Sequence, residues 1–64
     1  MENYIITNYE TVTVPQTLKD RYIKRNLKNL EAGRLIKFEY TDFGFYTVYQ
    51  RPSGIYQQTE YVFK

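Results

Sequence analysis

The chain has 64 residues, of which 42% are hydrophobic and 19% aromatic, and its formal net charge is +2. It contains no cysteine and no histidine, which excludes a disulfide framework, a thiolate metal site and a histidine general base. A chain of this length is expected to form one small domain, residues 1–64, and such domains often gain stability from oligomerisation or a partner.

Residues 3–14 are rich in threonine, valine, isoleucine and tyrosine, which favour β-strands. This segment is predicted to form one long strand, or two short strands on either side of Asn8. Pro15 ends it, because proline has no N–H to donate to a neighbouring strand. The strand is expected at the edge of the sheet or paired with a second subunit.

Residues 17–32 have the pattern of an amphipathic helix. Thr17 is the predicted N-cap with Asp20 as its capping-box partner, and Gly33 is the predicted left-handed residue at the C-terminal end. Leucine, isoleucine and tyrosine side chains share one half of the helical wheel. The opposite side carries a basic face that consists of Arg21, Lys24, Arg25 and Lys28.

The basic helix face has two interpretations. Charged side chains on the solvent side of a helix are ordinary in soluble proteins. Four cations on one face also suit the phosphate backbone of a nucleic acid, and tyrosine side chains elsewhere in the chain suit stacking on bases. Phosphate contact by these four residues is therefore the alternative to a solvated surface.

Residues 34–64 are predicted to form a three-stranded antiparallel meander. Its strands are expected at residues 34–41, 45–51 and 55–63. The turns at 41–44 and 51–54 both end in glycine, which suits a type I turn followed by a left-handed residue. The predicted fold class is α+β: one amphipathic helix packed on a three- to four-stranded antiparallel sheet, in the chain order β-α-β-β-β.

Turns of this kind also predict the register of the sheet. Tyr40 then opposes Tyr46, and Phe38 opposes Val48. The face that the helix covers is predicted to carry the five residues Ile36, Phe38, Tyr40, Tyr46 and Val48. The other face carries aromatic and aliphatic side chains without a visible cover, and exposed apolar patches commonly mark interaction sites. The predicted protein-contact residues on that face are Phe45, Tyr49, Ile55 and Tyr61.

The turn at 41–44 contains Asp-Phe-Gly, the tripeptide that holds magnesium in protein kinases. No glycine-rich loop, strand lysine or catalytic loop accompanies it, so the tripeptide is predicted to serve as a turn. The adjoining Phe43-Gly44-Phe45 resembles the centre of the aromatic motif of RNA-recognition domains. That resemblance covers one short segment, in which Thr41-Asp42 replaces the basic start of the motif and Val48 its final aromatic residue.

The chain shows no pattern of catalytic groups, since its carboxylates have no paired spacing and its single serine belongs to a turn. We therefore predict a non-enzymatic protein without cofactor or metal. The favoured function is an interaction protein that binds a protein partner or itself through the aromatic sheet face. The alternatives are a nucleic-acid-binding module that uses the basic helix face with tyrosine stacking, and a structural component of a larger assembly such as a phage particle.

The expected location is the cytoplasm of a bacterial host. No apolar run is long enough to span a membrane, and the first residues lack the basic and apolar regions of a signal peptide. Residues encoded by AT-rich codons are abundant, which suggests a low-GC bacterium or one of its phages as the source.

Overall fold

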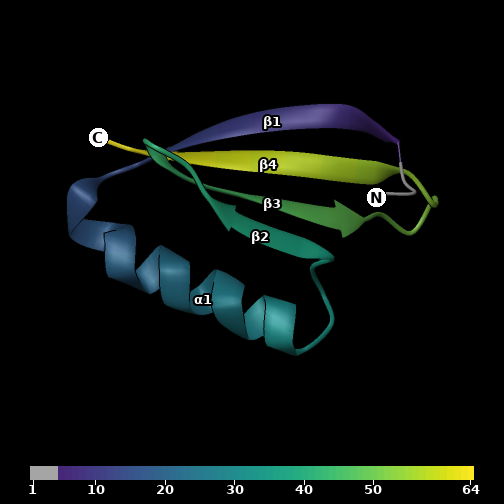
Figure 1. The fold of residues 1–64 in the computed structure, drawn as a ribbon, viewed down its shortest axis with the longest axis horizontal. Coiled ribbons are helices and arrows are strands. Elements are labelled where there is room, and N and C mark those ends of the chain that lie inside the picture. The colour runs from purple at the N-terminus through teal and green to yellow at the C-terminus, as the bar shows by residue number, and fades with distance from the viewer. Residues whose placement is uncertain (1–4) are drawn as a thin grey trace.

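The computed structural model describes residues 5–64, which form four strands and one α-helix (Figure 1). The elements are β1 (Ile6–Val14), a 3-10 turn (Gln16–Leu18), α1 (Lys19–Glu31), β2 (Lys37–Tyr40), β3 (Gly44–Gln50) and β4 (Tyr56–Phe63). The predicted α+β class and chain order are confirmed, because α1 packs on one face of a single sheet (Figure 1). Residues 3 and 4 of the predicted first strand lie outside the described residues.

The sheet is mixed rather than antiparallel, which corrects the prediction. Its strand order is β1-β4-β3-β2, and β1 runs parallel to β4 while the other pairs are antiparallel. The helix runs back along the sheet, so β2 starts from the same end as β1 (Figure 1). Two hairpins then reverse the direction twice, which leaves β4 pointing the same way as β1.

The helix ends as predicted but begins differently. Gly33 has a φ of +80° and supplies the left-handed residue that follows the last turn. At the start, the predicted cap by Thr17 with Asp20 is wrong, because α1 begins after Leu18 without a side-chain cap. Thr17 instead lies within the 3-10 turn that follows Pro15, where the Leu18 N–H donates to the Pro15 carbonyl at 3.0 Å.

The first hairpin has a two-residue turn, Asp42 and Phe43, instead of the predicted three-residue turn. The Thr41 hydroxyl closes it by accepting hydrogen bonds from the N–H groups of Gly44 at 3.0 Å and Phe43 at 3.3 Å. Gly44 therefore belongs to β3, and its φ is not positive. A Cβ at Gly44 would overlap the carbonyl oxygen of Tyr61 in β4, so the close approach of two strands requires glycine there.

The shorter turn shifts the register of this hairpin by one residue. Phe38 opposes Thr47 instead of Val48. Tyr40 opposes Phe45 instead of Tyr46. Because a one-residue shift moves every side chain of a strand to the other face, the two faces of β3 and β4 are exchanged relative to the prediction.

The second hairpin agrees with the prediction. Gly54 has a φ of +91°, and its N–H donates to the Arg51 carbonyl at 2.8 Å. The Arg51 N–H donates to the Ile55 carbonyl at 2.8 Å, which closes a three-residue loop. The register of β3 against β4 therefore follows from this turn as expected.

Phe45 is the centre of the core between sheet and helix. Its side chain is 0% exposed, and its ring centroid lies 4.8 Å from that of Phe38 and 4.6 Å from that of Tyr61. The helix joins this cluster through Tyr22, whose ring centroid lies 6.1 Å from that of Tyr61. Asn26 is also buried against the sheet, and its Nδ2 donates to the Tyr22 carbonyl at 2.8 Å.

The face of the sheet away from α1 is largely polar. Tyr46 of β3 lies between Glu39 of β2 and Glu60 of β4. The Lys37 Nζ lies 5.7 Å from the centroid of the Tyr46 ring. Val48, which the predicted register places under the helix, is buried on this outer face. The uncovered face therefore differs from the aromatic face that the sequence predicts.

Candidate functional site

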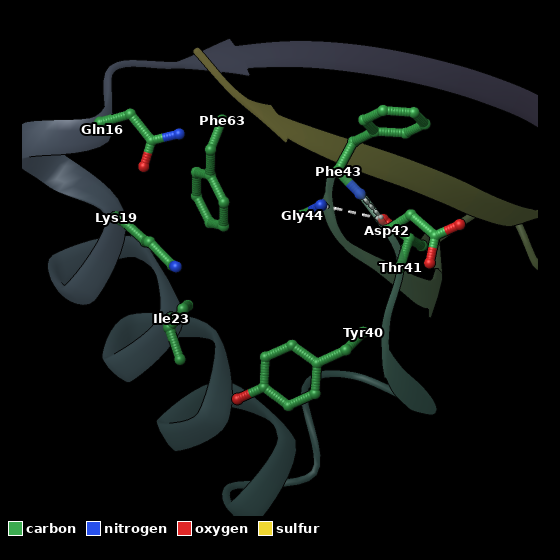
Figure 2. A pocket seen from close by; sticks show the side chains of 9 residues that line it. All are labelled: Gln16, Lys19, Ile23, Tyr40, Thr41, Asp42, Phe43, Gly44 and Phe63. Atoms are coloured by element: carbon green, nitrogen blue, oxygen red, sulfur yellow. Dashed lines mark hydrogen bonds between the residues drawn. The ribbon is translucent and has the colours of Figure 1, made fainter.

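A pocket of about 260 Å³ opens between the start of α1 and the turn at residues 41–44 (Figure 2). Ile23 of α1, Tyr40 of β2 and Phe63 of β4 supply its apolar walls, and their side chains point into the space (Figure 2). Lys19 and Asp42 lie on opposite sides of it. The pocket therefore has apolar walls, polar groups of Gln16 and Thr41 in its lining, and one positive and one negative side chain at its rim.

The cation at the rim is held against the aromatic wall. The Lys19 Nζ lies 5.6 Å from the centroid of the Phe63 ring, within the range of a cation–π contact. Lys19 belongs to the first turn of α1, and Phe63 is the last residue of β4. This contact places the positive charge beside the apolar interior of the pocket.

Large apolar side chains remain exposed around this pocket. Tyr40 is 64% exposed, and Phe43 is 71% exposed and extends from the turn away from α1 (Figure 2). Leu27 and Ile36 are also exposed and continue the apolar surface along α1 and toward β2, the strand that α1 approaches most closely. We call Ile23, Leu27, Ile36 and Tyr40 the α1–β2 apolar surface.

The four predicted protein-contact residues do not form one free surface. Phe45 is completely buried, and Tyr49 and Tyr61 are partly buried on the side of the sheet that carries α1. Ile55 is 43% exposed but lies in the second turn, at the opposite end of β3 from the pocket. The prediction of an uncovered face fails here because of the register shift in the first hairpin.

The pocket residues Tyr40, Phe43 and Phe63 are absent from the predicted contact residues. One signal for them is present in the sequence, because Phe43 lies within a turn and turns run over the protein surface. An aromatic side chain there has little core to pack against. The convergence of Tyr40 and Phe63 has no such local signal, since it depends on the order of the strands.

The basic helix face lies on the exposed side of α1, as predicted. Arg21, Lys24 and Lys28 are exposed, and no carboxylate among residues 5–64 forms an ion pair with them. Arg25 is also exposed, and its Cζ lies 5.5 Å from the centroid of the Tyr22 ring on the same helix. Three of the four cations therefore face solvent without a protein partner in the described part of the chain.

A hydrogen-bonded polar cluster joins β1 to β4 on the helix side of the sheet. The buried Gln57 accepts from Arg51 Nη1 at 2.7 Å, and its Nε2 donates to Glu10 Oε2 at 3.1 Å. The Gln57 Nε2 also lies 3.4 Å from the Thr59 hydroxyl, which accepts from it. The exchange of faces explains why polar residues such as Gln57 and Thr59 are buried here.

Tyr61 lies beside this cluster and makes stability depend on pH. Burial raises the pKa of its hydroxyl above the usual 10.0, and the Glu10 carboxylate adds to the rise while Arg25 opposes it. The unfolded chain therefore loses this proton first as the pH increases. At neutral pH the hydroxyl is protonated in both states, so its ionisation does not affect the free energy of unfolding. We expect the free energy of unfolding to fall as the pH rises above about 10.

Urea denaturation measured at several pH values between about 8 and 11 tests this expectation. Tyr61→Phe should make the fall at high pH shallower. The matched variant Tyr9→Phe changes a hydroxyl on an exposed residue and should keep the wild-type fall. Identical pH profiles for Tyr61→Phe and the wild type would contradict the role given to Tyr61.

Within residues 5–64, no group of three or more acidic, histidine or cysteine side chains is placed to hold a metal ion. Among the described helices, none has the length and apolar character needed to cross a membrane. Comparison with protein-family models, with curated proteins and with solved structures finds no match to this chain.

Proposed function

We propose that this protein is a protein-interaction domain that anchors an apolar side chain of a protein partner in the pocket beside the turn at 41–44. The observation that carries the proposal is a pocket with apolar walls from Ile23, Tyr40 and Phe63, beside which the aromatic side chains of Tyr40 and Phe43 are exposed. The pocket is smaller than the roughly 300–1,000 Å³ typical of small-molecule sites, which favours a single side chain as the occupant. Interface hot spots commonly have this form, with an anchor in a pocket surrounded by residues that exclude water.

The surroundings of the pocket support a protein ligand. The α1–β2 apolar surface continues beyond the pocket and gives a partner further area to cover. Lys19 and Asp42 at the rim would set the orientation of the partner by charge, since complementary charges fix register more than affinity. A structural component of a larger assembly, such as a phage particle, would use the same surface.

The alternative function is nucleic-acid binding by the basic helix face. The observation that favours it is the set of exposed cations without an acidic partner among the described residues, Arg21, Lys24 and Lys28. Contacts between these cations and phosphates would release counterions, so binding would weaken as the salt concentration rises. Base stacking on the predicted sheet face has little support, because Phe45 is buried and Tyr22 packs beside Tyr61.

A pull-down from native lysate, with and without nuclease, distinguishes the two functions. The immobilised wild-type protein is expected to retain a protein partner in both conditions. Phe43→Asp should reduce the retained partner at least about tenfold, because a charge replaces an exposed aromatic residue beside the pocket, where the partner would cover it. Ile55→Asp is the matched control, since it changes an exposed apolar residue at the other turn, and it should retain the partner.

Other outcomes of the pull-down would assign binding to a different surface. Material that is lost after nuclease treatment, or in the double variant Lys24→Ala and Lys28→Ala, would favour the nucleic-acid function. Equal capture by Phe43→Asp and the wild type would show that the pocket is not the binding site.

A further inference from the structure

The strand β1 forms an edge of the sheet and pairs on one side only, with β4. At its end, the Val14 carbonyl accepts from the Lys64 N–H at 2.9 Å, and the Gln16 N–H donates to the Lys64 carbonyl at 3.0 Å. Backbone groups of alternate residues along a strand point to opposite sides, so the even-numbered residues between 8 and 14 bond to β4. The residues whose N–H and C=O groups point away from the sheet are therefore Tyr9, Thr11 and Thr13.

This edge has few of the features by which proteins prevent strands from pairing. It is nine residues long, contains no proline, and has Glu10 as its single charged residue. The other edge, β2, has four residues and carries Lys37 and Glu39. Short, charged edge strands resist pairing, whereas long and uncharged ones act as templates for a further strand. Of the two edges, β1 is therefore the one suited to accept a strand.

We propose that two copies of this chain form a dimer by antiparallel pairing of their β1 strands about a twofold axis at Thr11. A twofold interface requires that the strand be complementary to itself. With the axis at Thr11, each Thr11 opposes its copy and each Tyr9 opposes Thr13 of the other chain. Every outward N–H and C=O group of these three residues then has a partner.

The neighbouring registers are less favourable. An axis at Glu10 would place the two carboxylates directly opposite each other, which is destabilising. An axis at Val12 would place Tyr9 opposite Pro15, which has no N–H to donate. With the axis at Thr11, the side chain opposite Glu10 is Val12, so no like charges are directly opposed.

The dimer and the pocket are independent features. The twofold axis is perpendicular to the joined sheet, so both copies of α1 lie on the same face of that sheet. The pocket lies between α1 and the turn that joins β2 to β3, and its lining includes no residue of β1. The paired residues 9–13 and the pocket lining therefore share no residue, and failure of either proposal does not decide the other.

Light scattering over a range of concentrations tests the association. The wild type is expected to show a mass that rises from monomer to dimer. Thr11→Pro removes an N–H that bonds to no strand of its own sheet, so it should keep the monomer fold and weaken the dimer at least about tenfold. Thr11→Val keeps the N–H and the β-branched shape and should dimerise like the wild type. A wild type that stays monomeric at its highest soluble concentration overturns the proposal.

Single cysteines test the register, because the chain has no cysteine of its own. Thr11→Cys places two thiols across the axis with their Cα atoms about 5.5 Å apart, within the range of a disulfide. With Thr13→Cys, each cysteine opposes Tyr9 of the other copy. The two cysteines are then offset by four residues along the paired strands, which separates their Cα atoms by about 13 Å. Mild oxidation should link the first variant and not the second. Equal or faster linkage of Thr13→Cys overturns the proposed pairing, whether or not Thr11→Pro folds.

Discussion

Replacing Phe45 with alanine is expected to remove most of the stability of the fold. The Phe45 ring is completely buried and stacks on Phe38 and Tyr61 at centroid distances of 4.8 and 4.6 Å. Truncating a core phenylalanine costs about 3–5 kcal/mol. In a domain of this length a single core rarely supplies more than about 3–5 kcal/mol, so the variant should be largely unfolded or close to its midpoint.

Urea denaturation followed by circular dichroism measures this loss. The matched control is Phe43→Ala, which removes the same ring two positions earlier, where the side chain is 71% exposed. Its effect should stay within about 0.5 kcal/mol. Similar losses in the two variants would contradict the register of the first hairpin, since that register places Phe45 in the core while Phe43 stays in the exposed turn.

Replacing Gly44 with alanine is expected to be about as damaging, for a different physical reason. The added Cβ would overlap the Tyr61 carbonyl oxygen of the neighbouring strand. Overpacking usually costs about 1–3 kcal/mol, and we expect the upper end or more because the obstacle is backbone and not a flexible side chain. To accommodate the methyl group, β3 and β4 would have to separate at the end that borders the pocket.

Gly54 provides the control, because its need for glycine is conformational. Its φ is +91°, and an added Cβ would meet no atom within 4 Å. Gly54→Ala should cost about 1–2 kcal/mol, and Gly54→Asn less, since asparagine tolerates the left-handed region. Gly44→Asn should instead be at least as damaging as Gly44→Ala. Thermal denaturation compares the four variants, and recovery of stability by asparagine at Gly44 would contradict the steric explanation.

The predictions that hold depend on signals within a few residues of chain. The helix end at Gly33 and the turn at Gly54 both use a left-handed glycine, and the structure has positive φ at both. The first hairpin has the same pattern of residues but a different turn. There the Thr41 hydroxyl accepts a hydrogen bond from the Gly44 N–H, which makes the turn shorter. Gly44 is needed because β3 closely approaches β4, and a contact between segments so distant in the sequence cannot be seen in a local pattern.

The candidate site likewise has one part that could be predicted from local sequence and one part that could not. The basic helix face is a property of helical periodicity alone, so its exposure could be predicted from the sequence. The pocket needs Ile23, Tyr40 and Phe63, which come from three elements and meet only because of the strand order. The predicted contact residues depended on one turn length, and a change of one residue moved Phe45 from an expected surface into the core.

The place of β4 within the sheet has a consequence for how the domain is made. It is the last strand along the chain, yet it lies between β1 and β3. While the chain is being synthesised, β1 has no partner until almost all the other residues have left the ribosome. The core also requires this strand, because Tyr61 stacks on Phe45. Folding therefore has to follow completion of β4 and depends on contacts between the most distant segments, which slow folding relative to local ones.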